Sequence, residues 1–263
     1  MDLISNENQI RLFFETVLPS GWKETEAAFV SLAARKKYAG EGSGLDFGHS
    51  TQMLAREIVK RPRLDEYIAK VRRFTAEDSY LDMTGHIIPV SAMVVYVNIH
   101  LSDAVKAWNK TKQEIARVDE EAMTHLFQGG GDLSHVSRQM KNLGGIWLTQ
   151  IQNSYSRKRW MDFDVDLLDP MARSEAHEKA MEILHGMEIA GTITIHTRGG
   201  FHLLVSTERN IFNKDVNPVT IRSSLEDVLK DASKEVAINR NGMVPLPGTR
   251  QGGNAVIMEI DKA

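Results

Sequence analysis

The segment Trp160-Met161-Asp162-Phe163-Asp164-Val165-Asp166 constrains the fold more than any other part of the chain. Its apolar and acidic residues alternate with the period of a β-strand, in which every second side chain lies on the same face. The alternation therefore predicts a strand that carries three carboxylates on one face. The opposite face, formed by Met161, Phe163 and Val165, is expected to be buried.

The elements around this strand follow a regular order. Periodicity and turn residues predict helices over 174–190 and 219–232, and strands over 192–196, 201–206, 235–239 and 255–260. The succession of strand, helix, hairpin, helix and further strands predicts an α+β fold, with the helices on one face of the sheet.

The N-terminal half is expected to form a module of its own. Strands are expected over 28–33 and 93–99, and a helix over 52–74 that is interrupted at Pro62. Ser102 and Asp103 are candidate caps of a long helix, which the glycines 129–131 end. Its expected inward stripe is Val105, Trp108, Ile115, Val118, Ala122 and Leu126. We therefore expect an N-terminal α/β module over 1–131 and a second module over 132–263.

The composition excludes several classes of protein. A chain of 263 residues with 42% hydrophobic residues is long enough to bury a full core. It has no cysteine, which excludes a disulfide scaffold, a zinc finger, an iron–sulfur cluster and thiol catalysis. Neither a signal peptide nor a membrane-spanning apolar run is visible. We therefore expect a soluble, cytoplasmic protein that has no membrane partner.

The net charge of −3 conceals an uneven distribution. Residues 30–75 contain ten Lys and Arg against five acids, and residues 133–161 contain five bases and no acid. Eight acids and two bases follow over 162–191. A basic surface beside a concentrated acidic site suits an enzyme that acts on nucleic acid with metal ions. Solvated faces of ordinary helices explain the same charges, so charge alone does not decide the function.

The three aspartates are candidate metal ligands. Adjacent carboxylates on one face repel each other, and a hard cation such as Mg²⁺ or Mn²⁺ relieves that repulsion. Such residues can bridge two metal ions in phosphoryl transfer. The alternative is an acidic edge strand whose charges discourage aggregation.

Two loops add candidate phosphate contacts. In the turn Thr197-Arg198-Gly199-Gly200, Arg198 is a natural phosphate clamp, and Gly200 allows close approach of the backbone. His202 begins an apolar strand, where a polar ligand would explain it, although a core histidine is the commoner outcome. His196 is expected to be structural. In the later loop Pro247-Gly248-Thr249-Arg250, Thr249 and Arg250 are candidates to face phosphate, although alone this is an ordinary loop.

In this order, the three motifs resemble the archaeo-eukaryotic primase superfamily, and in particular the primase-polymerases of phages, plasmids and other mobile elements. The acidic Asp-x-Asp strand comes first, and Gly200-Phe201-His202 stands in place of the usual Ser-x-His. Pro247-Gly248-Thr249 matches a Pro-Gly-Ser/Thr turn, and Tyr96-Val97-Asn98 with the helix after it looks like the N-terminal module. The resemblance covers most of residues 90–260.

The resemblance implies a primase-polymerase core, in which an N-terminal α/β module and an RRM-like C-terminal module enclose the active site. Asp162 and Asp164, with Asp166 as a further or substitute member, match the metal-binding acids, and His202 matches the histidine that contacts the incoming triphosphate. Arg198 and Thr249 or Arg250 lie where phosphate contacts are expected. Asp231 and Glu235 are candidates for the third acid that the family adds.

The implied activity is template-directed nucleotidyl transfer, with Mg²⁺ or Mn²⁺ as cofactor and nucleoside triphosphates as substrates. The expected partners are a single-stranded DNA template and primer, and a replicative helicase is a further candidate. Basic residues around Arg157, Lys158 and Arg159, and from Arg56 to Arg73, are expected to follow the template backbone.

Two other functions remain open. A rolling-circle relaxase or nuclease would use a similar sheet, but it needs two histidines one residue apart, whereas His196 and His202 are six apart. A single-strand-binding replication initiator with a degenerate site would carry base-stacking aromatic residues on its sheet.

Overall fold

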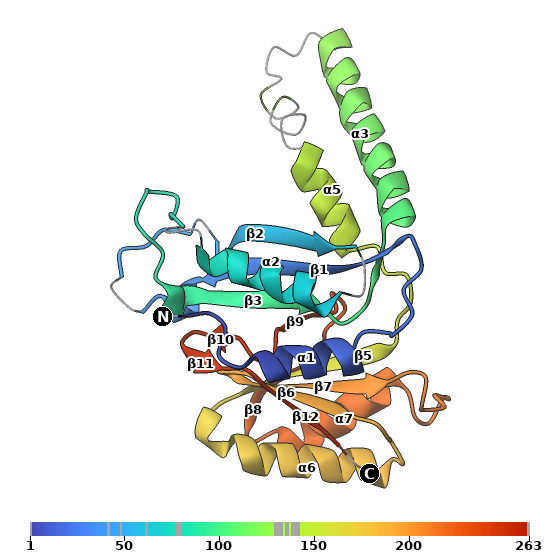
Figure 1. The fold of residues 1–263 in the computed structure, drawn as a ribbon. Helices are drawn as coiled ribbons and strands as arrows, with labels where there is room; N and C mark the ends of the chain where they lie inside the picture. Colours follow the sequence, from blue (N-terminus) through green and yellow to red (C-terminus); the bar gives the residue numbers. More distant parts are fainter. Residues whose placement is uncertain are drawn as a thin grey trace.

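The computed structural model describes residues 2–40, 43–47, 49–60, 63–76, 80–128, 134, 137 and 143–261. The chain is an α+β protein with two antiparallel sheets, as the order of elements predicts. Figure 1 shows the two sheets one above the other, with α1 (Glu7–Thr16) between them. The expected module boundary at residue 131 lies outside the described residues.

The first sheet has the strand order β11-β10-β3-β1-β2, while β4 pairs with β1 and β9 pairs with β3. Its strands are β1 (Glu26–Arg35), β2 (Thr51–Val59), β3 (Met93–Asn98), β4 (Ser102–Asp103), β9 (Met243–Pro245), β10 (Arg250–Gln251) and β11 (Asn254–Ala255). The strands expected over 28–33 and 93–99 are therefore present. Because β9 to β11 come from the C-terminal part of the chain, the two sheets are not successive halves of the sequence.

The helix expected over 52–74 is wrong in its first half. Residues Thr51–Val59 form β2, which pairs with β1 from Arg35–Thr51 to Ala28–Val59. Only α2 (Leu64–Ala76) is helical in the part of this segment that the structure describes. The run Leu54-Ala55-Arg56-Glu57 has good helix formers, but pairing with the buried strand β1 overrides local propensity.

The second sheet has the order β12-β6-β7-β5-β8. Its strands are β5 (Trp160–Leu167), β6 (Ile193–His196), β7 (Gly200–Ser206), β8 (Ser233–Ile238) and β12 (Ile257–Ile260). With α6 (Arg173–Gly186) after β5 and α7 (Pro218–Leu229) after β7, the chain follows a β-α-β-β-α-β path. That path with the order β8-β5-β7-β6 is the split β-α-β arrangement, to which β12 adds an edge strand.

Two cores hold the second sheet. On one face, Phe163, Val165 and Leu167 of β5 pack with the buried faces of α6 and α7. On the other face, Trp160 and Leu204 join the core of the first sheet and α1. The helices thus cover one face of this sheet, as expected, and the other face is turned toward the first sheet.

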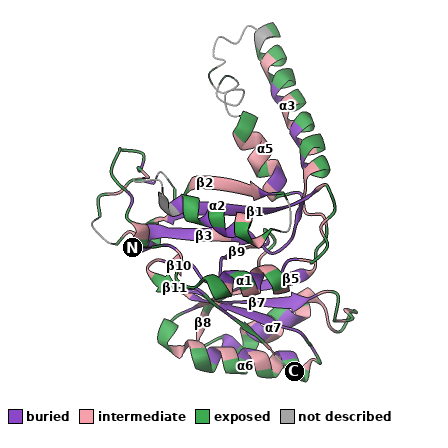
Figure 2. Ribbon diagram, viewed as in Figure 1, coloured by how far each residue is buried: buried purple, intermediate pink, exposed green. Residues whose placement is uncertain are grey.

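The long helix α3 (Ala104–Phe127) and α5 (Leu143–Gln152) project away from both sheets (Figure 1). Figure 2 shows that α3 is mostly exposed. The expected stripe is wrong at Val105 and Trp108, which are 55% and 52% exposed, while Ala107 and Thr111 are buried. The buried face is rotated because α3 packs on α5, where Trp108 meets Trp147 edge-on, and because Ala107 joins Phe29 of β1 and Ile151 of α5 in a small core.

Candidate functional site

The three aspartates of β5 lie on the face that is turned toward the first sheet. Phe163 and Val165 alternate with them and are buried under the helices, so the alternation places these side chains as the sequence predicts. Trp160 begins the same row and is part of the shared core. Along this face of β5, the apolar contact that Trp160 makes with the first sheet is therefore followed by a polar region that the aspartates line. We call Asp162, Asp164 and Asp166 the acidic row.

His202 of β7 lies against the acidic row. It is the strand partner of Asp164, and its Nδ1 lies 3.0 Å from Oδ1 of Asp162. Its Nε2 lies 3.6 Å from Oδ1 of Asp164, an ion-pair contact that is longer than a hydrogen bond. Burial acts to lower the pKa of His202, but the charges of Asp162 and Asp164 and the hydrogen bond with Asp162 raise it to about 9. The imidazole is therefore held as a cation between two carboxylates.

Asp162 is the anchored member of the row. Its side chain is fully buried, and its Oδ2 accepts a hydrogen bond of 2.7 Å from Nδ2 of Asn239. The backbone N–H of Asn239 also donates to the carbonyl oxygen of Asp162. Because His202 contacts Oδ1 and Asn239 donates to Oδ2, both oxygens of this carboxylate are occupied by contacts that position its neighbours. Nothing in the local sequence marks Asn239 as a partner of Asp162, so it was not among the predicted site residues.

Asp164 and Asp166 are the open members of the row. The side chain of Asp164 is 41% exposed, and Asp166 is half-buried. Burial raises the pKa of Asp164, and the charges of Asp162 and Asp166 raise it further, whereas His202 and Lys37 lower it. These two carboxylates are therefore crowded and can still reach a ligand.

The candidates for a third acid lie in different places. Glu235 of β8 is the strand partner of Asp166, so its side chain lies on the face of the acidic row. Asp231 precedes β8, is exposed, and acts electrostatically on Lys179 of α6. The structure thus brings Glu235 to the row and leaves Asp231 on the helix side of the sheet.

The first sheet supplies a wall of cations and phenols opposite the row. Arg35, at the end of β1, donates a hydrogen bond of 2.6 Å to the hydroxyl of Tyr96 on β3. Burial acts to lower the pKa of Arg35, but Tyr96, Tyr38 and Asp166 raise it overall. The sequence analysis missed Arg35 and Tyr38. The only local signal was a basic run, Arg35-Lys36-Lys37, that follows an apolar strand.

Arg198, in the turn between β6 and β7 of the second sheet, packs against this wall. Its guanidinium lies 5.0 Å from the ring centre of Tyr38 and donates to the carbonyl of Gly252. Its backbone N–H donates to Oε1 of Gln251 at 2.9 Å. Gly252 has a φ of +57°, and a Cβ there would lie 2.5 Å from the guanidinium, so only glycine allows this packing.

A hollow of about 250 Å³ lies where Arg198 meets the acidic row. Its lining combines one carboxylate of the row, Asp166, with three cations, Lys37, Arg198 and Lys234. The other lining residues are Tyr38, Leu167, Pro170 and Gly199. A carboxylate beside clustered cations is an arrangement that can hold a phosphate group together with a divalent ion.

The remaining predicted residues do not line this hollow. Gly200 is a packing residue, since a Cβ there would lie 1.8 Å from the carbonyl oxygen of Val165 on the neighbouring strand. Thr249 is buried, and its hydroxyl donates to the carbonyl of Leu246. Arg250 donates to the carbonyl of Gly253. In that loop Gln251 and Gly252 are the residues that accept hydrogen bonds from Arg198.

No family model matches the chain, and comparisons with curated proteins and with solved structures find no match either. In the part of the chain that the structure describes, none of the helices combines the length and the apolar character needed to cross a bilayer. The case for a function therefore depends on the site itself.

Proposed function

We propose that the protein is a metal-dependent nucleotidyltransferase of the primase or primase-polymerase type, which joins nucleotides on a single-stranded DNA template. One observation carries the proposal: Asp166 lines a hollow of about 250 Å³ together with the cations Lys37, Arg198 and Lys234. The open carboxylate of Asp164 stands next to Asp166 in the row and is within the electrostatic reach of Lys37. The split β-α-β path of the second sheet agrees with the RRM-like module that the family resemblance implies. In this proposal the first sheet is the N-terminal module.

The donor set fits a divalent cation. Crowded carboxylates that share one face favour a hard cation with oxygen ligands, and Mg²⁺ and Mn²⁺ are such cations. Asp164 and Asp166 would hold it, with Glu235 as the additional acid on the same face. When bound, the metal supplies charge neutralisation at the reacting phosphate and activation of the attacking hydroxyl. Asp162 acts as a positioning residue, because both of its oxygens are engaged by His202 and Asn239.

The cations that line the hollow, together with Arg35, suit the phosphates of a nucleoside triphosphate. Arg198, Lys37 and Lys234 line the hollow with Asp166. Arg35 has a buried Nε that lacks a hydrogen-bond partner among the described residues, and a buried donor of this kind calls for an acceptor such as a phosphate oxygen. We assign Arg198 to the β- and γ-phosphates and His202 to a phosphate contact through Nε2, the nitrogen that Asp162 does not hold.

Fewer of the predicted basic residues are available to a DNA template than the sequence suggests. Arg157 pairs with the buried Glu26, and Arg159 makes two hydrogen bonds of 2.9 Å to Glu208. Both guanidinium groups are engaged by carboxylates of the protein itself, so they are less available to a phosphate backbone. Lys36 and Lys37 are exposed beside the hollow and are better placed for that role.

The relaxase alternative loses support from the geometry. Ile195 is the strand partner of His202 and His196 is that of Phe201, so the two histidines lie on opposite faces of the sheet. They therefore do not form one ligand pair. An initiator with a degenerate site would bind single-stranded DNA at this surface without joining nucleotides.

A variant series tests the proposal through incorporation of a labelled nucleotide on a primed single-stranded template with Mn²⁺. Asp166→Asn is expected to lower incorporation by at least about a hundredfold, the scale of losing one transition-state electrostatic contact. Glu235→Gln is expected to lower it as well, whereas the matched control Asp231→Asn keeps wild-type activity. Equal activity of Asp166→Asn and Asp231→Asn would contradict the assignment.

A further inference from the structure

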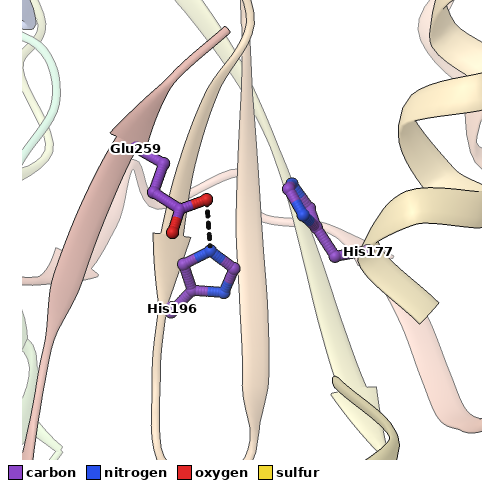
Figure 3. Close-up of side chains that lie close together, drawn as sticks. All are labelled: His177, His196 and Glu259. Carbon is purple, nitrogen blue, oxygen red and sulfur yellow. Dashed lines mark ion pairs between the residues drawn. The ribbon is translucent and has the colours of Figure 1, made fainter. Parts of the chain in front are cut away.

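Two histidines and a glutamate meet on the helix side of the second sheet, away from the acidic row. His177 comes from α6, His196 from the end of β6, and Glu259 from β12 (Figure 3). Each offers one ligand atom, and these atoms lie within 4.8 Å of one another. The three residues are far apart in the sequence, so only the fold brings them together.

Strand register separates this cluster from the acidic row. His196 is the partner of Phe201, whose side chain belongs to the core beneath the helices. His202, the next residue of β7, points to the opposite face and reaches Asp162. The ring of His177 lies 5.1 Å from that of His196 and 5.6 Å from that of Phe201. A ligand at this cluster would therefore not touch the proposed nucleotidyl-transfer site.

The present contacts orient the three side chains. Nε2 of His196 lies 3.2 Å from Oε2 of Glu259, the ion pair that Figure 3 marks with a dashed line. Nε2 of His177 lies 2.9 Å from the hydroxyl of Thr194. A hydrogen bond from the ring nitrogen that does not bind the metal fixes the orientation of a metal-ligating imidazole. Two imidazoles and one carboxylate on three different elements form a donor set for a transition metal.

We propose that His177, His196 and Glu259 bind a divalent transition-metal ion of the Zn²⁺ class. Imidazole nitrogen distinguishes this donor set from the all-oxygen acidic row, which favours Mg²⁺ or Mn²⁺. The side chain of Glu259 is 60% exposed, so the site opens to solvent and a water molecule completes the coordination.

Metal binding at this site would stabilise the position of β12, the last strand of the second sheet. Among the described strands, β12 is at the edge of the sheet and pairs with β6 alone, and three of its four residues are exposed. An ion held by Glu259 of β12 and His177 of α6 links that edge to the helix layer. Because the ion binds the folded chain, it is expected to raise the unfolding temperature and to slow amide exchange in β12.

Calorimetric titration of the full chain with Zn²⁺ tests the proposal. Glu259→Gln and His177→Ala are each expected to weaken Zn²⁺ binding at least about tenfold, the lower end of what losing a ligand or its support costs. The matched control is His185→Ala, which removes another histidine of α6 that pairs with a carboxylate, Asp261, and leaves Zn²⁺ binding unchanged. Glu259 is exposed, so its variant is expected to fold even where His177→Ala does not.

The test is also separable from the nucleotidyl-transfer proposal. The double variant Asp164→Asn/Asp166→Asn keeps the cluster intact and is expected to bind Zn²⁺ as the wild type does. Zn²⁺ binding that is lost in Glu259→Gln but kept in the double variant supports the site. Absence of saturable binding in the wild type, or equal affinity in Glu259→Gln and the wild type, overturns it.

Discussion

Nδ1 of His202 lies 3.0 Å from a carboxylate oxygen of Asp162, and both side chains are buried between the two sheets. The same carboxylate accepts a hydrogen bond from Asn239, so it joins three strands or strand ends of the second sheet. This contact decides which acids of the row are open to a ligand. It also fixes the ring of His202 with Nε2 toward Asp164.

Removing one partner of this pair is expected to be costly. His202→Ala leaves the Asp162 carboxylate buried without its cation, and loss of one member of a buried pair costs about 3–5 kcal/mol. The double variant Asp162→Asn/His202→Gln removes both charges, so it should lose less than the sum of the single variants. Urea unfolding of Asp162→Asn, of His202→Gln and of the double variant measures the coupling. Additive losses would show that the two side chains do not act as a pair.

Gly200→Ala is expected to destabilise the second sheet. A Cβ at this position would lie 1.8 Å from the carbonyl oxygen of Val165, so β5 and β7 must move apart. We expect a loss of about 1–3 kcal/mol, the usual range for overpacking.

The matched control for that change is Gly144→Ala in α5, where a Cβ meets nothing within 4 Å. Alanine in a helix is favoured over glycine by up to about 1 kcal/mol, so this variant should be neutral or stabilised. Thermal unfolding of both variants checks the contrast. A Gly200→Ala protein as stable as the wild type would contradict the close approach of the strands.

His100 is expected to make stability depend on pH. It is buried, and this burial, with the charges of Lys158 and Arg159, lowers its pKa from 6.5 to about 4. The unfolded chain therefore binds a proton between pH 6.5 and pH 4 that the folded chain does not. The contribution is fully present above pH 6.5, and about 3 kcal/mol of it is lost as the pH falls toward 4.

Urea unfolding across that pH range measures this effect. His100→Gln removes the titrating group, so the free energy of unfolding should fall less steeply with acid than in the wild type. The comparison uses the slopes, because the variant also loses the ring contact with Tyr155. Identical slopes in the two proteins would show that folding does not lower the pKa of His100.

Local patterns account for the parts of the fold that the sequence predicts. The alternation of β5 and the glycine turn of the β6–β7 hairpin depend on neighbouring residues, and both elements form where expected. β2 was mistaken for a helix because its composition is ambiguous until β1 offers a pairing edge. The return of β9 to β11 to the first sheet depends on contacts across most of the chain, which no local pattern records.

The candidate site also contains residues that local sequence predicts and residues that only tertiary packing brings together. The acidic row and His202 follow from one strand and one hairpin, so the sequence indicates them directly. The opposite wall of Arg35, Tyr38 and Tyr96 comes from the other sheet, and only tertiary packing brings it to the row. Thr249 was expected to face phosphate, but its hydroxyl is used within its own loop.

Binding of single-stranded DNA is expected to weaken as salt rises, despite the net negative charge. If about four phosphates are neutralised, the logarithm of affinity should fall with a slope of about −3 against the logarithm of salt concentration. Lys37→Gln removes one cation beside the hollow and should reduce the slope by about 0.7. Lys179→Gln on α6 is the control and should leave the slope unchanged. Affinity that does not vary with salt would contradict this surface as the template path.

The most direct test of the central claim is whether the template directs nucleotide addition. Primed single-stranded templates that present a different base at the first unpaired position are incubated with Mn²⁺ and each labelled nucleoside triphosphate in turn. We expect the wild type to add the complementary nucleotide to each template, and Asp164→Asn/Asp166→Asn to add none while it remains folded. Single-stranded DNA binding without addition, addition that ignores the template base, or full activity of the double variant would contradict the account.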